Sequence, residues 1–189
     1  MLMKNKNIVL RYLTEDDIAD YIRWTTIETE CCDWDAPWEE DDGDKFVKRQ
    51  KAALQKAPQI FRKLEIDTLL GQHIGWVTSY YIDGDEEKIA VGINIPSVDE
   101  RGKGVGESSL TLFMTYLFRT KNILYTQTWS GNIAMIRLAE KIRFVEVERI
   151  KNIREVKGKT YDALTFSISK EAFFNKYAHL YTASAFMIE

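Results

Sequence analysis

Six consecutive residues in the middle of the chain have the composition of an anion-binding turn. They connect an apolar strand pattern to an amphipathic helix pattern, and they are Arg101, Gly102, Lys103, Gly104, Val105 and Gly106. Glycine lets the backbone approach an anion closely and adopt positive φ. The free amides and the dipole of a helix N-terminus favour a phosphate at the same place. Arg101 and Lys103 add positive charge. The sequence therefore predicts a phosphate-binding turn at residues 101–106.

The spacing within this turn argues against two nucleotide-binding motifs. A Walker A loop requires Ser or Thr after its Gly-Lys pair, whereas Gly104 follows Lys103. A dinucleotide fingerprint requires glycine at the sixth position counted from Gly102, and that position is Glu107. The turn therefore binds a different phosphate-bearing ligand, or it is a glycine-rich turn that binds none.

Hydrophobic periodicity predicts the elements that hold the turn. A helix follows it directly, because apolar residues recur at helical spacing at Leu110, Phe113, Met114, Leu117 and Phe118. Further helices are expected from about residue 14, at 44–57, at 135–142 and from 171. Strand patterns occupy 8–13, 59–67, 72–82, 88–95, 122–129, 144–150 and 160–168. This order predicts an α+β fold in a single domain over residues 1–189, with a C-terminal helix and tail at 171–189.

The overall composition excludes several classes of function. The chain has 189 residues, 45% of them hydrophobic, and a net charge of -3, so it offers no general basic surface for nucleic acid. No apolar run reaches the roughly 20 residues that span a bilayer, and no signal peptide is recognisable. Cys31 and Cys32 are adjacent, and His73 and His179 are not at metal-ligand spacing, so we expect no metal site. We expect a cytoplasmic protein that binds neither membrane nor nucleic acid.

Two blocks of sequence together resemble the GNAT N-acetyltransferase superfamily. Residues 101–106 match its Arg/Gln-x-x-Gly-x-Gly/Ala signature. Residues 128–144, which begin Thr-Trp-Ser-Gly-Asn, are similar to the helix block that follows at the same distance. With the segment 8–17 included, the likeness covers about residues 8–170 and is greatest to the RimJ/RimL-like branch.

The resemblance implies a fold, a co-substrate and a reaction. The fold is a mixed, mostly antiparallel sheet of about seven strands, flanked by helices, with a splay between its two central strands. Acetyl-CoA would bind at residues 101–106, and its pantetheine arm would pair with the backbone of Ile93, Asn94 and Ile95. Asn132 and Met135 would lie beside this arm, and Asn132 could also cap its helix. The acetyl group would pass to a primary amine, on a polyamine-like molecule or a protein N-terminus, by direct attack in a ternary complex.

Two positions depart from the family pattern. Ala139 stands where members often have a tyrosine that protonates the leaving thiolate, and Arg143 stands where they have the glycine that ends the helix. That glycine adopts the left-handed conformation, which costs a residue with a side chain roughly 1–2 kcal/mol. We therefore expect either a strained Arg143 or an altered helix end. These departures leave a non-catalytic sensor of CoA or acetyl-CoA as the alternative to an enzyme.

The acceptor site is predicted from carboxylates and tryptophans. An ammonium group must lose a proton before it attacks a thioester, so we expect Glu65 as general base and Asn94 as a residue that orients water. A solvated Glu65 is the alternative.

Residues 28–44 contain nine carboxylates and no Lys or Arg, which would attract a cationic amine. We expect a subset of this segment to line the pocket, namely Glu28, Trp34, Asp35, Trp38 and Glu39. Residues 34–39 also resemble a loop of spermidine acetyltransferases. The alternative is a solvated acidic loop anchored by buried tryptophans. The protein is expected to be a monomer or a homodimer.

Overall fold

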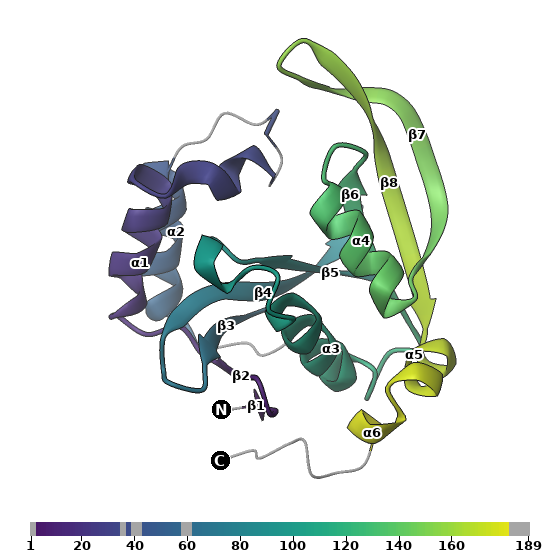
Figure 1. The fold of residues 1–189 in the computed structure, drawn as a ribbon, viewed down its shortest axis with the longest axis horizontal. Helices are drawn as coiled ribbons and strands as arrows, with labels where there is room; N and C mark the ends of the chain where they lie inside the picture. Colours follow the sequence, from purple (N-terminus) through teal and green to yellow (C-terminus); the bar gives the residue numbers. More distant parts are fainter. Residues whose placement is uncertain (1–2, 35–36, 39–42, 58–61, 182–189) are drawn as a thin grey trace.

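One eight-stranded sheet organises the fold, with its strands in the order β1-β2-β3-β4-β5-β6-β8-β7 (Figure 1). The structure is a computed structural model that describes residues 3–34, 37–38, 43–57 and 62–181. Neighbouring strands are antiparallel except for the parallel pair β5 and β6. The strands are β1 (Met3–Lys4), β2 (Ile8–Arg11), β3 (Lys63–Thr68), β4 (His73–Ile82), β5 (Asp85–Asn94), β6 (Ile123–Trp129), β7 (Val145–Val156) and β8 (Lys159–Ser169).

The sheet confirms the expected mixed, mostly antiparallel architecture. The strand beyond the expected seven is β1, a two-residue strand whose Met3 pairs with Leu10 of β2. The expected closing pair near the C-terminus is the antiparallel hairpin of β7 and β8.

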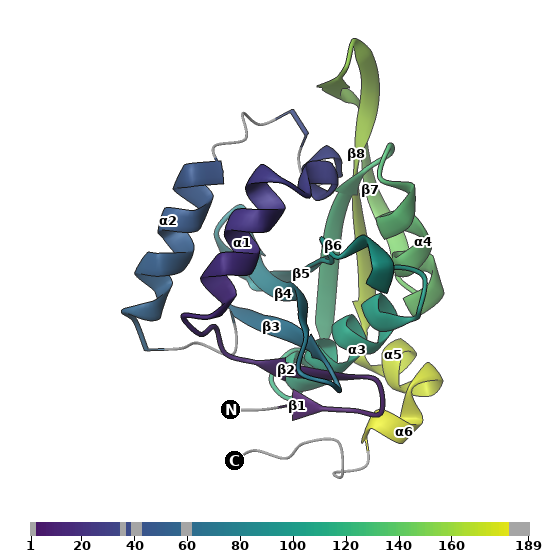
Figure 2. The ribbon, with the colours of Figure 1, turned by 60° about the vertical axis from the view of Figure 1, so that its left-hand side comes forward.

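Helices cover both faces of the sheet, as Figure 2 shows, with α1 and α2 on one face and α3 to α6 on the other. None of the described helices is long and apolar enough to cross a membrane. The helices are α1 (Asp17–Thr26), α2 (Gly43–Leu54), α3 (Val105–Leu117), α4 (Ile133–Ile142), α5 (Lys170–Lys176) and α6 (Ala178–Tyr181), with 3-10 turns η1 (Thr29–Asp33) and η2 (Val98–Glu100).

The main core lies between the sheet and α3. The face predicted from periodicity is the buried one, because Leu110, Phe113, Met114, Leu117 and Phe118 are each at most 1% exposed. They pack against apolar residues of the strands, α4 and α5. Burial of several large apolar side chains stabilises this contact and fixes the N-terminus of α3 against the sheet.

A second, smaller core attaches α1 and α2 to the opposite face. Tyr21, Trp24, Val47 and Trp76 are buried there, and the ring of Trp76 lies 5.1 Å from that of Tyr21 and 5.8 Å from that of Trp24. Because Trp76 belongs to β4, this core places α1 over β3 and β4. The predicted helix start near residue 14 is displaced to Asp17, whose carboxylate accepts hydrogen bonds from the Thr14 amide and hydroxyl.

The sheet opens between its central strands β5 and β6. Along these fully described strands the ladder has one register pair, Ala90 with Tyr125. The end of β5, residues 91–94, therefore leaves β6, and we call this opening the splay. It confirms the expectation of a gap between the two central strands, and η2 and the glycine-rich turn follow directly after it.

Candidate functional site

The glycine-rich turn has the conformation that its glycines predict. Gly102 and Gly104 adopt positive φ angles of 76° and 81°, and Gly104 is the N-cap residue of α3. A Cβ built on either glycine meets no atom within 4 Å, so the requirement for glycine is one of backbone conformation. The amides of the first helical turn have no acceptor within the helix, and they point toward the turn. This geometry is suited to an anion.

The Arg101 side chain serves the turn differently from the expectation. Its Nε donates to the Ile95 carbonyl at 2.9 Å and its Nη2 to the Pro96 carbonyl at 3.3 Å. Its Nη1 lies 3.1 Å from a carboxylate oxygen of Glu30. Arg101 therefore fastens the turn to the end of β5 and to η1. Lys103, in contrast, is exposed and pairs with Glu100 at 2.9 Å.

The end of β5 lies between β4 and the splay. Ile93 and Ile95 pack against the main core. Asn94 is the register partner of Trp76 on β4, and the Trp76 side chain faces α1 and α2, so Asn94 lies on that face of the sheet. A Cβ at Gly75 would lie 2.1 Å from the Asn94 carbonyl, so only glycine allows the strands to approach here. At the start of the splay, Thr126 of β6 donates to the Val91 carbonyl at 2.9 Å.

The first turn of α4 lies against the segment around η1. Asn132 is the N-cap of α4, since its side-chain oxygen accepts from the Met135 amide at 3.0 Å, which confirms the capping role. Its Nδ2 and the indole Nε1 of Trp129 both donate to the Trp34 carbonyl, each at 3.1 Å. A Cβ at Gly131 would lie 1.8 Å from the Trp129 ring, so glycine is required there too.

The other end of α4 carries the expected strain. Arg143 has φ 82° and ψ 25°, in the left-handed region, which confirms the first of the two expectations for this residue. The Phe144 amide bonds to the Ala139 carbonyl at 3.0 Å and the Arg143 amide to the Glu140 carbonyl at 3.0 Å. These two bonds form a Schellman motif, which usually uses glycine. Ala139 is fully buried and has no hydroxyl to offer.

The fold supplies counter-charges that the local sequence of the acidic segment lacks. Glu28 lies 3.3 Å from Arg23, Glu30 lies 3.1 Å from Arg101, and Asp33 lies 3.0 Å from Lys157. Each of these carboxylates is thus paired with a cation from another element, which weakens their attraction for an incoming amine. Asp35 and Glu39 lie outside the described residues.

The two tryptophans of this segment take different positions. Trp34 is 39% exposed, and its carbonyl is the acceptor shared by Trp129 and Asn132. Trp38 meets Trp129 edge to face at 6.0 Å, and the Arg154 guanidinium lies 4.4 Å from the centre of its ring. Arg154 therefore holds a cation–π contact of the kind expected for a substrate amine.

Glu65 lies in a buried network on β3, away from the splay. It is 0% exposed, and its Oε2 accepts from the Tyr21 hydroxyl at 2.6 Å and lies 3.1 Å from His73 Nε2. Lys63 donates to the Tyr21 hydroxyl at 2.5 Å and to Gln50 at 2.7 Å. Two strands separate Glu65 from β6, so it does not project to the splay as expected. It is also not a solvated strand residue, because the fold encloses it.

The network shifts the pKa values of its members in opposite directions. Burial and the negative charge of Glu65 raise the pKa of Tyr21 well above its ordinary value. Burial lowers the pKa of Lys63, against the opposing effect of Glu65. Sequence reasoning missed Tyr21, Lys63 and His73, because their proximity depends on how α1 packs on the sheet.

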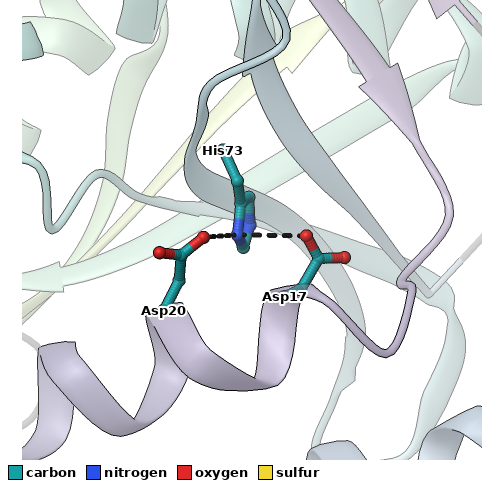
Figure 3. A group of neighbouring side chains, drawn as sticks. All are labelled: Asp17, Asp20 and His73. Atoms are coloured by element: carbon teal, nitrogen blue, oxygen red, sulfur yellow. Dashed lines mark hydrogen bonds and ion pairs between the residues drawn. The ribbon is translucent and has the colours of Figure 1, made fainter.

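His73 links the network to two aspartates of α1 (Figure 3). Its Nδ1 lies 3.0 Å from Asp20 and 3.3 Å from Asp17, while its Nε2 faces Glu65. A neutral imidazole has one N–H, whereas here both nitrogens face carboxylates, so the imidazolium form suits the site. Burial acts to lower the pKa of His73, but the hydrogen bond to Glu65 and the charges of Glu65 and Asp17 outweigh it and raise the pKa.

Asp17, Asp20 and His73 also have the spacing of a metal site, with ligand atoms within 4.8 Å of one another. However, Arg11 donates to both oxygens of Asp17 at 2.7 Å, and Arg23 lies 2.8 Å from Asp20. The two carboxylates are thus already neutralised by arginines and by His73. We interpret this cluster as an ion-pair network that fastens α1 to the sheet.

Known structures share this fold. An acetyltransferase of the GNAT family from Bacillus anthracis superimposes with a TM-score of 0.74 at 13% identity, over 90% of this chain and 99% of that one. RimL, a ribosomal L7/L12 α-N-protein acetyltransferase in complex with coenzyme A, gives 0.74 at 14% identity, over 91% and 99%. Spermidine N-acetyltransferase from Vibrio cholerae, in complex with CoA and spermine, gives 0.72 at 18% identity, over 90% and 100%.

The sequence itself identifies the family. No curated protein matches it significantly. Residues 7–145, however, match the family model described as the acetyltransferase (GNAT) domain, and this range includes the turn, the splay and α4. The match covers most of the chain and agrees with the α+β sheet and its helices. The chain therefore belongs to the GNAT acetyltransferase family and is an acyltransferase enzyme.

Proposed function

We propose that the protein transfers an acetyl group from acetyl-CoA to a primary amine. The observation that carries this proposal is the turn at residues 101–106, which combines positive-φ glycines with a helix N-terminus and follows directly after the splay. Coenzyme A has a pyrophosphate, which suits the helix N-terminus at the turn, and an extended pantetheine arm, which suits the splay. The common sheet of β1 to β8 supports treating residues 1–189 as one domain.

The residues that would hold the coenzyme form a continuous path. The amides of residues 102–106 would bind the pyrophosphate, and the backbone of Ile93, Asn94 and Ile95 would pair with the pantetheine arm. Asn132 and Met135 would flank the arm, since α4 begins beside the splay. Arg101 would hold the turn in shape through its bonds to the end of β5.

The reaction we propose is a direct attack in a ternary complex. The amine nitrogen forms a bond to the thioester carbonyl carbon, the carbon–sulfur bond breaks, and sulfur leaves as a thiolate. Because Ala139 offers no acid, the thiolate takes its proton from water or from the product ammonium. Glu65 is enclosed by Tyr21 and His73 and would act through them as a positioning residue, while Asn94 at the splay would orient water.

The acceptor is either a small polyamine or the α-amine of a protein. RimL is an enzyme of the second kind and the Vibrio cholerae enzyme one of the first. The pairing of Glu28, Glu30 and Asp33 with basic side chains weakens the argument for a polyamine. Trp34 and Trp38, with Asp35 and Glu39, remain candidates for the acceptor pocket.

Release of the free thiol from acetyl-CoA, measured with a chromogenic disulfide, tests this function. The acceptors are spermidine, a peptide with a free N-terminal alanine, and the same peptide with a blocked N-terminus. We expect turnover with at least one free amine and none above background with the blocked peptide. Tight binding of acetyl-CoA without turnover by either amine would instead support the sensor function.

A pair of glycine variants tests the turn. Gly104→Ala forces a side chain into the left-handed region, which costs about 1–2 kcal/mol and should raise the KM for acetyl-CoA about 10-fold. Gly84→Ala is the matched control, because Gly84 has a φ of 76° and equally free space but lies in the hairpin between β4 and β5. Equal KM values for the two variants would argue against coenzyme binding at the turn.

A further inference from the structure

A row of hydrogen-bonded polar side chains crosses the sheet on the face that carries α1 and α2. The Tyr80 hydroxyl lies 3.3 Å from Gln127 Oε1, and Gln127 Nε2 lies 3.4 Å from Thr165 Oγ1. Thr165 Oγ1 lies 3.2 Å from Glu148 Oε2. These residues come from β4, β6, β8 and β7, and we call them the polar row. None of them was a candidate from the sequence.

The polar row passes over the start of the splay. Gln127 pairs with Thr165 and Thr165 with Glu148, so these three side chains emerge on the same face of neighbouring strands. Tyr80 pairs with Ala90 of β5, the residue whose partner on β6 marks the start of the splay. The contact between Tyr80 and Gln127 therefore spans β5.

The strand beneath this contact carries small residues. On this face of β5 lie Ala90 and Gly92, and the Thr78 hydroxyl of β4 lies over Gly92, 3.1 Å from where a Cβ would stand. Tyr80 is 39% exposed and Gln127 is exposed, so both are accessible from solvent. A ligand that reaches the splay from this side meets the polar row first.

The carboxylate of Glu148 sets the direction of every hydrogen bond in the row. An ionised carboxylate only accepts, so the Thr165 hydroxyl must donate to Glu148. Thr165 therefore accepts from the amide nitrogen of Gln127, which turns the amide oxygen toward Tyr80. The Tyr80 hydroxyl then donates to that oxygen. The orientation of the Gln127 amide, which is otherwise ambiguous, follows from this chain of bonds.

The consequence is a site that presents acceptors. The Tyr80 oxygen keeps a lone pair after it donates its proton, and the Gln127 carbonyl oxygen has a second one. Both can accept a hydrogen bond from an incoming ligand. An ammonium or amine group supplies N–H donors and needs such acceptors. The pair offers a carboxylate only the second N–H of the Gln127 amide, because the first donates to Thr165 and the Tyr80 hydroxyl donates to Gln127.

We propose that the polar row binds the acceptor amine. Tyr80 and Gln127 contact the amine, while Thr165 and Glu148 are positioning residues that fix the orientation of the Gln127 amide. This assignment rests on the proposed function and adds the residues that recognise its acceptor. It assigns recognition of the acceptor to residues other than Glu65, which the fold encloses.

Substitutions at Thr165 test the positioning role. Thr165→Val keeps the shape of the side chain and removes the hydroxyl, so the Gln127 amide can turn its NH2 group toward the amine. The loss of one hydrogen bond to a charged group should raise the KM for the amine about 10-fold. The KM for acetyl-CoA should stay unchanged. Thr165→Ser should restore the wild-type KM because it keeps the hydroxyl.

Thr160→Val is the matched control on the same strand. Thr160 bonds to Asn152 at 3.4 Å and lies outside the polar row, so its removal should leave the KM for the amine unchanged. Equal KM values for the amine in Thr165→Val, Thr165→Ser and Thr160→Val would overturn the proposal. So would a rise in the KM for acetyl-CoA equal to that for the amine, which indicates a general structural defect.

Equilibrium binding separates this proposal from the proposed function. Calorimetry with spermidine and with the alanine peptide, in the presence of CoA, measures amine binding without turnover. About 10-fold weaker binding by Thr165→Val than by Thr165→Ser would support the polar row even in a protein that transfers no acetyl group. Absence of binding of both amines to the wild-type protein, or equal binding to the two variants, would contradict it.

Discussion

Arg143 is the residue where this chain departs most visibly from the pattern of its family. The end of α4 keeps the two Schellman hydrogen bonds, and Phe144 remains buried beside Ala139. The backbone therefore ends the helix as it would with glycine, although Arg143 has a side chain and its φ angle is 82°. The strain is in the backbone, and the Arg143 side chain itself is exposed.

Replacing Arg143 with glycine should stabilise the protein. Relief of the left-handed strain gains about 1–2 kcal/mol, and the greater freedom of glycine in the unfolded chain offsets about 0.4–1 kcal/mol. We expect a net increase of about 0.5–1 kcal/mol in the free energy of unfolding, measured by urea denaturation. Arg143→Ala removes the same side chain but keeps the strain, so it should not be stabilised. An equal increase in the free energy of unfolding of both variants would attribute the gain to loss of the Arg143 charge and not to relief of backbone strain.

At the scale of elements, Asn132 joins α4 to the segment around η1. Its oxygen caps the helix and its nitrogen bonds to the Trp34 carbonyl, so one side chain performs two separable tasks. Two substitutions divide these tasks, because aspartate keeps an oxygen for the cap and loses the donor.

Asn132→Ala should lower the free energy of unfolding by about 1 kcal/mol through loss of the cap. Asn132→Asp should stay within about 0.5 kcal/mol of the wild type, because aspartate is an equally good N-cap. Hydrogen exchange of the amides in 29–34 should accelerate in both variants, since each loses the bond to Trp34. Unchanged exchange in Asn132→Asp would show that the Trp129 indole alone holds this segment.

Elements whose signals are local were predictable, and contacts that depend on register were not. The buried face of α3 and the left-handed Arg143 follow from residues close together in the sequence. The polar row unites residues of four strands, and no local pattern reports how those strands align. Glu65 illustrates the same limit. Its place in an alternating strand was evident, but the packing of α1 over it was not.

At the scale of the whole molecule, the network around His73 connects α1 to three strands of the sheet. It joins Asp17 and Asp20 of α1 to Glu65 of β3, with His73 of β4 between them. Arg11 of β2 pairs with Asp17 at 2.7 Å and with Asp67 at 2.5 Å. The stability of this arrangement depends on the charge of each member, and therefore on pH.

The free energy of unfolding should fall as pH rises above neutrality. The folded pKa of His73 lies above the ordinary value of 6.5, so the folded state binds its proton more tightly than the unfolded state. This contribution is complete below the unfolded pKa and is lost as pH rises through the folded pKa. Urea denaturation between about pH 6 and about pH 9 measures it. His73→Gln should show a smaller decline, and an equal decline would place the titrating group elsewhere.

Acid should destabilise the same network from the other side. Burial raises the pKa of Asp17, but the hydrogen bonds from Arg11 and Thr14 outweigh it and keep the pKa below the ordinary value of 3.8. A lowered folded pKa stabilises the protein above the unfolded pKa, and this stabilisation is lost as pH falls through the folded pKa. This network therefore stabilises the protein most at pH values between the unfolded pKa of Asp17 and the unfolded pKa of His73, and its contribution falls on either side of that interval.

The contacts of the segment around η1 have a thermodynamic consequence. Glu30 bonds to Arg101 of the glycine-rich turn, the Trp34 carbonyl accepts from Asn132 at the start of α4, and Asp33 pairs with Lys157, which follows β7. A ligand on one side that displaces this segment changes the free energy of binding on the other side. Such coupling is reciprocal. For the proposed coenzyme and amine, we therefore expect each ligand that displaces this segment to change the affinity of the other by the same factor.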